Sequence, residues 1–210
     1  MFDAGANVGH WSTAANAVFR GQATIHAFEP SPPTYDRLCQ TVAGLQMVRP
    51  HPVGLSDERR TVTILHSPGT SEKTSVEGSA AQALNTRLSD YEKLPAQLVR
   101  GDEFCRENGI EVIHFLKIDT EGHDLSVLRG FGEMLSQGAI AVIQFEYNRL
   151  NLFTENLLRH FYELMPAYRI GRVFPNSVRF KDYDPADENF IDGNFLAVAS
   201  NRSPLIVDLS

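Results

Sequence analysis

Apolar and polar positions along the chain predict strands that alternate with helices. Short apolar runs typical of buried strands occur at 24–28, 47–53, 112–119 and 139–145, and an extended run occurs at 61–66. Segments with helical periodicity cover 11–19, 33–42, 98–108, 124–135 and 154–165. The runs 168–173 and 195–199 are predicted to form a C-terminal antiparallel hairpin. This alternation indicates an α/β fold with a doubly wound, mostly parallel sheet in a single domain spanning residues 1–210.

Two stretches interrupt the alternation. Residues 67–83 are rich in Gly, Ser, Thr and Ala, and they are expected to form a loop that is either a lid or a plain surface excursion. Residues 175–193 are polar and aromatic and show no regular period. Phe180, Tyr183 and Phe190 in this stretch could flank a sugar ring, or they could simply hold an ordered surface loop in place.

The segment Asp3-Ala4-Gly5-Ala6-Asn7-Val8-Gly9 predicts a strand end that passes through glycines into a helix. Gly5 and Gly9 have no Cβ, and the helix start presents unpaired N–H groups, so a cofactor could approach this backbone closely. A dinucleotide site has the spacing Gly-x-Gly-x-x-Gly. The spacing Gly5-x-x-x-Gly9, with Asp3 just before it, favours a cofactor with an amino-acid tail, such as S-adenosylmethionine. The alternative is a glycine turn that only closes a βα unit.

An acidic residue follows 20 residues after Gly9. Glu29 ends the β-favouring run 24–29 and is followed by Pro30 and Ser31. A carboxylate has two acceptor oxygens, so Glu29 at a strand end could accept hydrogen bonds from both hydroxyls of a ribose. We expect Glu29, Pro30 and Ser31 to bind the cofactor together with Asp3, Gly5, Ala6, Asn7 and Gly9.

Charged residues gather where the two central strands are predicted to end. Lys117 and Asp119 project from the same side of the first strand, Glu121 and His123 follow in the turn, and Glu146 ends the next strand. The acids and the histidine are candidate catalytic bases, and two close carboxylates would share a proton, a divalent cation or Lys117. The alternative is that Lys117 forms a purely structural ion pair and that His123 is the exposed start of a helix.

Four segments resemble the FkbM family of methyltransferases: residues 3–9, Ala-Phe-Glu-Pro at 27–30, Val-Gly-Leu-Ser-Asp at 53–57 and Phe-Leu-Lys-Ile-Asp-Thr-Glu-Gly at 115–122. The last segment is the most particular, and the resemblance is strongest before residue 150. It implies a Rossmann-like class I methyltransferase that uses S-adenosylmethionine to methylate an oxygen of a sugar, glycolipid or secondary metabolite. It also implies that Ser56 and Asp57 contact the adenine. The alternatives are a non-catalytic S-adenosylmethionine-binding module and an NAD-dependent enzyme.

The composition limits which classes of binding partner are expected. A formal net charge of −7 argues against a nucleic-acid partner, because no basic stripe is present to contact phosphates.

The cysteines and the apolar runs bear on the compartment. Two cysteines without a Cys-x-x-Cys motif predict reduced thiols. There is no 18-residue apolar run and no signal peptide, so a cytoplasmic protein without a membrane span is expected. Only Met1 and Phe2 precede the first motif, which suggests that the native chain begins further upstream. The acceptor is expected to be a small molecule or a glycan, and the metal requirement and oligomeric state stay open.

Overall fold

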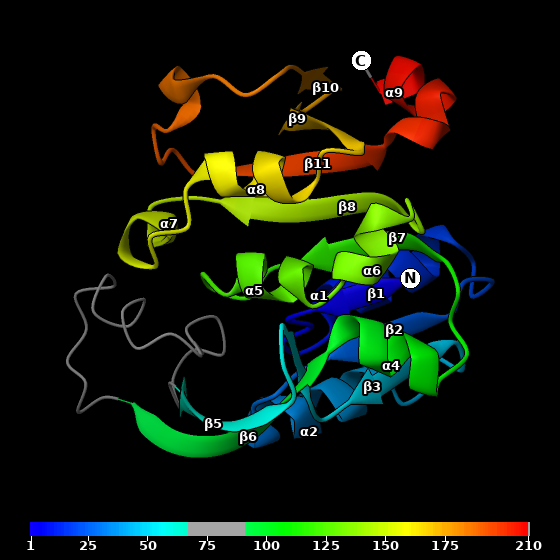
Figure 1. Ribbon diagram of the computed structural model, residues 1–210. Coiled ribbons are helices and arrows are strands. Elements are labelled where there is room, and N and C mark those ends of the chain that lie inside the picture. Colours follow the sequence, from blue (N-terminus) through cyan, green and yellow to red (C-terminus); the bar gives the residue numbers. More distant parts are fainter. Residues whose placement is uncertain (67–90, 210) are drawn as a thin grey trace.

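The computed structural model describes residues 1–66 and 91–209. Its main sheet has the strand order β10-β9-β11-β8-β7-β1-β2-β3 (Figure 1). The strands are β1 (Phe2–Ala4), β2 (Ile25–Phe28), β3 (Val48–His51), β7 (Ile113–Ile118), β8 (Ile140–Tyr147), β9 (Tyr168–Phe174), β10 (Ser177–Phe180) and β11 (Gly193–Ala199). Strands β3, β2, β1, β7 and β8 are parallel, whereas β11, β9 and β10 pair antiparallel. The predicted α/β class with a mostly parallel sheet is therefore confirmed.

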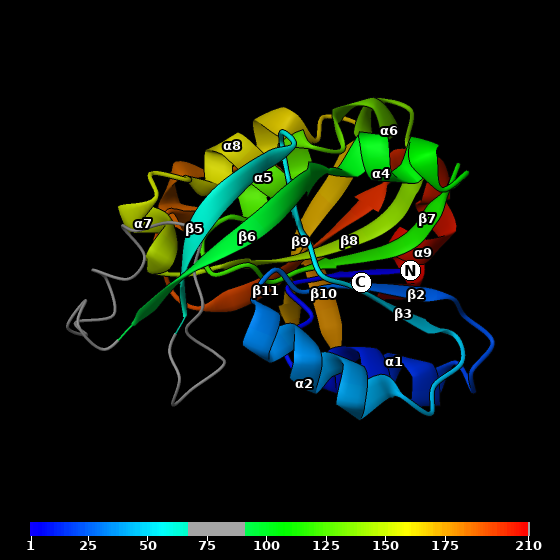
Figure 2. The ribbon, with the colours of Figure 1, turned by 90° about the horizontal axis from the view of Figure 1, so that it is seen from below.

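Helices cover both faces of this sheet (Figure 2). One face carries α1 (His10–Val18) and α2 (Pro32–Val42), and the other carries α4 (Gly101–Glu107), α5 (Asp124–Arg129), α6 (Gly132–Ser136) and α8 (Leu158–Leu164). The remaining helical segments are α7 (Leu150–Phe153), α9 (Ser203–Leu209) and the 3₁₀ turns η3 (Pro185–Asp187) and η4 (Ser200–Arg202). None of the helices in the described residues is long and apolar enough to cross a membrane.

Alternate residues of each strand build two cores. Ile25 and Ala27 of β2 pack under α1 and α2, whereas Phe28 on the opposite face belongs to the larger core below α4, α5 and α8. The rings of Phe145 and Phe161 stack in that larger core with centroids 4.5 Å apart. A sheet buried on both faces explains why its strands have apolar sequences instead of a clean alternation. Cys39 and Cys105 are both free thiols, as expected.

A second sheet with the order β4-β6-β5 lies beside the main one (Figure 1). It consists of β4 (Gly54–Ser56), β5 (Arg60–His66) and β6 (Glu92–Arg100). The short helix expected within 98–108 is α4, which begins at Gly101, whereas Leu98 and Val99 before it are buried residues of β6, a strand that the sequence analysis missed. Residues 54–57 were expected from their sequence to form a turn, but Gly54–Ser56 is a short strand that pairs with β6.

Other predicted boundaries also change. The helix predicted over 124–135 is split into α5 and α6 at residues 130–131, and the helix predicted over 154–165 starts at Leu158. The irregular stretch 175–193 contains β10, so the antiparallel end of the sheet has three strands, with β11 between β8 and β9. The predicted loop or lid at 67–83 lies outside the described residues.

Candidate functional site

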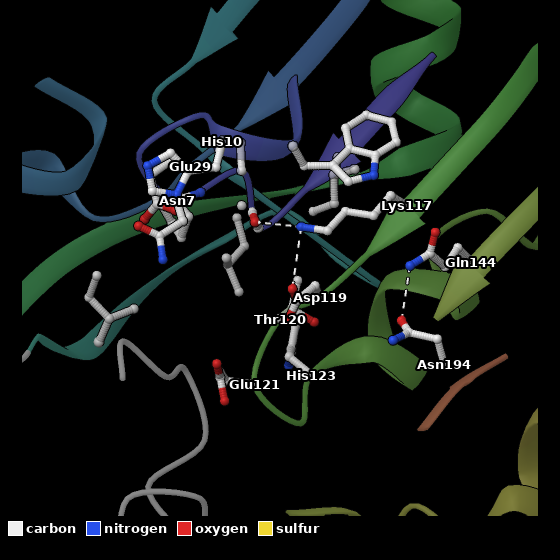
Figure 3. Close-up of a pocket in the computed structure, with 18 residues that line it drawn as sticks. Asn7, His10, Glu29, Lys117, Asp119, Thr120, Glu121, His123, Gln144 and Asn194 are labelled. Carbon is white, nitrogen blue, oxygen red and sulfur yellow. Dashed lines mark hydrogen bonds and ion pairs between the residues drawn. The ribbon is translucent and has the colours of Figure 1, made fainter. Parts of the chain in front are cut away.

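A cavity of about 390 Å³ lies at the carboxyl ends of the parallel strands. Its lining comes from the turn after β1, from the ends of β2 and β7, and from β4, β8 and β11. Asn7 and Glu29 lie at one end, Gln144 and Asn194 lie at the other, and Lys117 lies between them (Figure 3). Ligands of open α/β sheets bind at this edge, so the cavity is the candidate active site.

The glycine turn after β1 is tightly packed against protein atoms. Gly5 has a φ of +74°, and a Cβ at this position would lie 1.9 Å from the carbonyl oxygen of Asp119. Gly9 has a φ of +90°, and its Cβ would lie 2.8 Å from Leu38 Cδ1. The expectation that both glycines give room to a ligand needs correction, because the nearest obstacle to a side chain is the protein itself in both cases. Gly5 nevertheless lines the cavity, and Gly9 does not.

Glu29 holds this turn in place. Its Oε2 accepts from the backbone N–H of Asn7 at 3.0 Å, and its Oε1 accepts from the backbone N–H of Ser31 at 2.9 Å. Burial raises the pKa of Glu29 to about 7, although both hydrogen bonds favour the charged form. Each oxygen keeps a second lone pair, so the carboxylate can still accept from a diol in the cavity. Pro30 also lines the cavity, whereas the buried Ser31 hydroxyl faces His66 Nδ1 at 3.2 Å.

Lys117 connects the glycine turn to the end of β7. Its Nζ lies 3.1 Å from Asp3 Oδ1 and 3.5 Å from Asp119 Oδ2, and it donates to the Gly5 carbonyl at 3.0 Å. Burial alone would lower the pKa of Lys117, but the two acids raise it above its ordinary value. Asp3 is fully buried, also accepts from Ser12 Oγ at 2.7 Å, and does not line the cavity. Asp3 therefore contacts Lys117 and Ser12 and does not border the cavity, and its predicted part in cofactor binding stays a prediction.

The turn after β7 has an uncommon backbone. Glu121 and Gly122 both adopt the left-handed conformation, with φ of 53° and 94°. A non-glycine residue in this conformation is strained, and such strain persists only where the surroundings fix it. Asp124 supplies that support, because its Oδ1 accepts from both the backbone N–H and the hydroxyl of Thr120. Burial raises the pKa of Asp124 to about 6, although these hydrogen bonds favour the ionised form and lower the pKa.

His123 is buried beside the cavity. Only 2% of it is exposed, so the alternative of an exposed helix start is wrong. Its Nε2 lies 2.9 Å from the hydroxyl oxygen of Ser56, and that hydroxyl donates to Asp57 Oδ1 at 2.9 Å. Ser56 and Asp57 do not line the cavity, although Gly54 and Leu55 of the same strand do. Adenine contact by Ser56 and Asp57 stays a prediction, and the Ser56 hydroxyl already holds His123.

Glu146 lies close to the acids at the end of β7. Burial raises its pKa to about 7, and the neighbouring charges of Asp119, Asp124 and Asp192 contribute in the same direction. Asp119 itself lines the cavity with 47% of its side chain exposed, whereas Glu146 is not among the lining residues. Asp119 therefore lies near both Lys117 and Glu146, and the predicted convergence of Asp119, Glu121 and Glu146 on the reaction stays a prediction. No group of three or more His, Cys, Asp or Glu side chains in residues 1–66 and 91–209 is placed to hold a metal ion.

Several cavity residues were missed by the sequence analysis. Gln144 lies two positions before Glu146 on the same strand face, so alternation could have found it. The others are His10, Trp11, Gly54, Leu55, Ile64, Leu98, Thr120 and Asn194. The aromatics proposed for an acceptor lie elsewhere: the Tyr183 hydroxyl donates to Glu188, the Phe190 ring stacks on Tyr147, and Phe180 does not line the cavity.

Comparison with known proteins identifies relatives of this architecture. The family model described as Methyltransferase FkbM domain matches residues 3–170. 2-O-methyltransferase NoeI of Sinorhizobium fredii is 28% identical over 168 residues, which are 76% of this chain and 68% of that protein. Hexuronic acid methyltransferase AglP of Haloferax volcanii is 28% identical over 149 residues, 69% of this chain and 54% of that protein. The chain thus matches between about half and two thirds of the length of these relatives.

A solved structure shares the fold. Methyltransferase FkbM from Methylobacillus flagellatus KT superposes with a TM-score of 0.58 at 16% identity, and the match covers 94% of this chain and 42% of that one.

Proposed function

The chain belongs to the FkbM methyltransferase family, and from this premise we propose that it transfers the methyl group of S-adenosylmethionine to a hydroxyl oxygen of a sugar, glycolipid or secondary metabolite. The observation that carries the proposal is one cavity lined both by the buried Glu29 carboxylate at one end and by the Lys117–Asp119 pair towards its middle. The names of NoeI and AglP support an acceptor oxygen and a sugar-derived acceptor, respectively.

The turn after β1 and Glu29 would hold the cofactor. Glu29 can accept from the ribose hydroxyls, the backbone of Gly5, Ala6 and Asn7 borders the same space, and Leu55 offers an apolar surface to a base. When bound, S-adenosylmethionine supplies a methyl group on a positively charged sulfur. The protein must then align the acceptor oxygen with that methyl group and accept the hydroxyl proton.

Asp119 is our first candidate for the residue that accepts the proton. Its carboxylate reaches the cavity, and Lys117 Nζ at 3.5 Å fixes its position from the buried side. Glu121 and His123 also line the cavity and are the remaining candidates there. Glu146 can hold a proton near neutral pH, because its pKa is raised to about 7. Glu146 is therefore our candidate for the group that receives this proton from Asp119.

Two measurements test the proposed function. Calorimetry should show that S-adenosylmethionine and its demethylated product bind, with NAD binding far more weakly. Transfer of a labelled methyl group should then be measured with a panel of hydroxylated acceptors. Tighter binding of NAD would overturn the cofactor assignment, and cofactor binding without transfer to any acceptor would favour a non-catalytic binding module.

Chelation tests the metal requirement separately. We expect EDTA to leave activity unchanged, because Lys117 already offsets the charges of Asp3 and Asp119. Loss of activity that Mg²⁺ or Mn²⁺ restores would instead indicate that a cation bridges the acids.

A further inference from the structure

We propose that the side-chain amides of Gln144 and Asn194, together with the indole of Trp11, form an acceptor subsite that selects an uncharged ring with two hydroxyls over a ring that carries a carboxylate. All three side chains line the cavity. The inference rests on the proposed methyl transfer, because it assigns the acceptor for that same cavity.

The strand register places the amide pair next to Lys117. Gln144 of β8 lies opposite Lys117 of β7 and opposite Leu196 of β11, so all three side chains project from one face of the sheet. Asn194 precedes Leu196 by two positions and shares that face. Gln144 Nε2 donates to Asn194 Oδ1 at 2.9 Å. Figure 3 shows this pair at the opposite end of the cavity from Asn7 and Glu29, where an acceptor would lie if the cofactor occupies the glycine turn.

The amide pair has hydrogen-bonding capacity beyond its mutual bond. That bond uses one N–H of Gln144 and one lone pair of Asn194. The carbonyl oxygen of Gln144 and the amino group of Asn194 therefore offer an acceptor and a donor on either side of this bond. Two hydroxyls on one ring, each of which can donate and accept, can engage both groups. A single hydroxyl would use only half of this capacity.

Trp11 provides an apolar wall for the same subsite. Its ring stacks on Phe115 of β7 with centroids 5.8 Å apart and an interplanar angle of 23°. Phe115 precedes Lys117 by two positions, so the stack stands on the sheet face that carries the amide pair. An indole fixed in this way can pack against the C–H face of a sugar ring.

The charges around the subsite disfavour an acidic ring. Asp119 and Glu121 line the cavity, and Glu146 lies opposite Asn194 in the β8–β11 register. Among the described residues, Lys117 is the only lysine or arginine in the lining, and it already pairs with Asp3 and Asp119. A carboxylate on the acceptor would lose its hydration beside three acids and would gain no unpaired Lys or Arg there.

Trp11 is the only tryptophan in the 210 residues, so its fluorescence reports on this subsite directly. The protein should first be saturated with S-adenosylhomocysteine, with binding confirmed by calorimetry. It should then be titrated with the methyl glycosides of glucose, galactose and mannose and with those of the matching uronic acids. We expect a saturable change with at least one neutral glycoside and a dissociation constant at least about tenfold higher for its uronic acid counterpart.

Three variants test the amide pair. Gln144→Met and Asn194→Leu should each raise the dissociation constant of the neutral glycoside about tenfold, because each removes hydrogen bonds at similar side-chain volume. Binding of S-adenosylhomocysteine should not change. Gln97→Met is the matched control, because Gln97 also donates from a strand amide, to Thr61 Oγ1 at 2.9 Å, but lies outside the cavity lining. This control should bind the glycoside like the unmodified protein.

The possible results of these titrations distinguish failure of the acceptor subsite from failure of the proposed function. If S-adenosylhomocysteine binds but no neutral glycoside changes the fluorescence, the subsite is overturned and the proposed function stands. Equal affinity for the uronic acid glycoside, or unchanged affinity in both cavity variants, also overturns the subsite. If S-adenosylhomocysteine does not bind, the proposed function fails and this inference fails with it.

Discussion

Replacement of Lys117 by methionine should destabilise the protein much more than removal of its partner Asp119. Methionine keeps most of the side-chain length but removes the ammonium group. Asp3 would then keep its hydrogen bond from Ser12 but lose the Lys117 ammonium, which lies 3.1 Å from its Oδ1, while it is 0% exposed. Asp119 would lose the same ammonium, but 47% of its side chain is exposed and water can replace the interaction.

The two substitutions, Lys117→Met and Asp119→Asn, should therefore lower the free energy of unfolding by different amounts. Removal of one member of a buried ion pair typically costs about 3–5 kcal/mol, because the other charge stays buried. Loss of an exposed ion pair costs about 0–1 kcal/mol. We expect Lys117→Met to fall in the first range and Asp119→Asn in the second. For a chain of this size, the melting temperature should fall by about 2–4 °C for each kcal/mol.

Urea denaturation followed by circular dichroism measures these differences. The double variant Asp3→Asn/Lys117→Met is the control, because it removes both charges of this buried pair and should recover most of the lost stability. A loss below about 1 kcal/mol for Lys117→Met would show that Asp3 does not depend on the lysine. The same reasoning would fail if the double variant were no more stable than Lys117→Met alone.

Three further predictions concern the cofactor and the reaction. Asp119→Asn should lower turnover by about 10²-fold or more, the scale for loss of a general base, with unchanged affinity for S-adenosylhomocysteine in calorimetry; normal turnover would exclude Asp119 as the base. That affinity should increase as the pH rises from about 6 to about 8, because the pKa of Glu29 is raised to about 7 and its ionised form is the better acceptor for a diol. Glu29→Gln should abolish this pH dependence, and a variant that keeps it would assign the titration to another group. In thermal unfolding, Gly5→Ala should be strongly destabilised, because its Cβ would lie 1.9 Å from a backbone oxygen, whereas Gly109→Ala, at a φ of +64° with nothing within 4 Å, should lose only about 1–2 kcal/mol. Equal losses in the two glycine variants would contradict the steric explanation.

The sequence was informative for those parts of the site that are formed by residues close together along the chain. The turn at residues 3–9 and the acid at position 29 follow directly from two strand ends, and both border the cavity. The strand 112–119 was found by its apolar run, and its alternation placed Lys117 and Asp119 on one side, as their shared ion pair requires.

The errors arose where contacts between distant segments determine the secondary structure or the position of a side chain. Leu98 and Val99 are apolar residues that suit a helix or a strand equally well, and pairing with β4 and β5 selects the strand. The need for glycine at position 5 depends on the Asp119 carbonyl, which is distant in sequence. The contact between Ser56 and His123 spans 67 positions, and no periodicity in either segment could indicate it. Asn194 likewise reaches the cavity only because β11 pairs with β8.

The position of β11 has a consequence for how the protein is synthesised. This strand is the last of the main sheet along the chain, yet it lies inside the sheet and pairs with both β8 and β9. A nascent chain that has not reached residue 193 leaves the apolar strand β8 with an open edge, and β9 and β10 cannot join the sheet. Such an edge is a template for intermolecular pairing. Ribosome pausing before β11, or a stop codon there, should therefore favour aggregation over a folded, partly active protein.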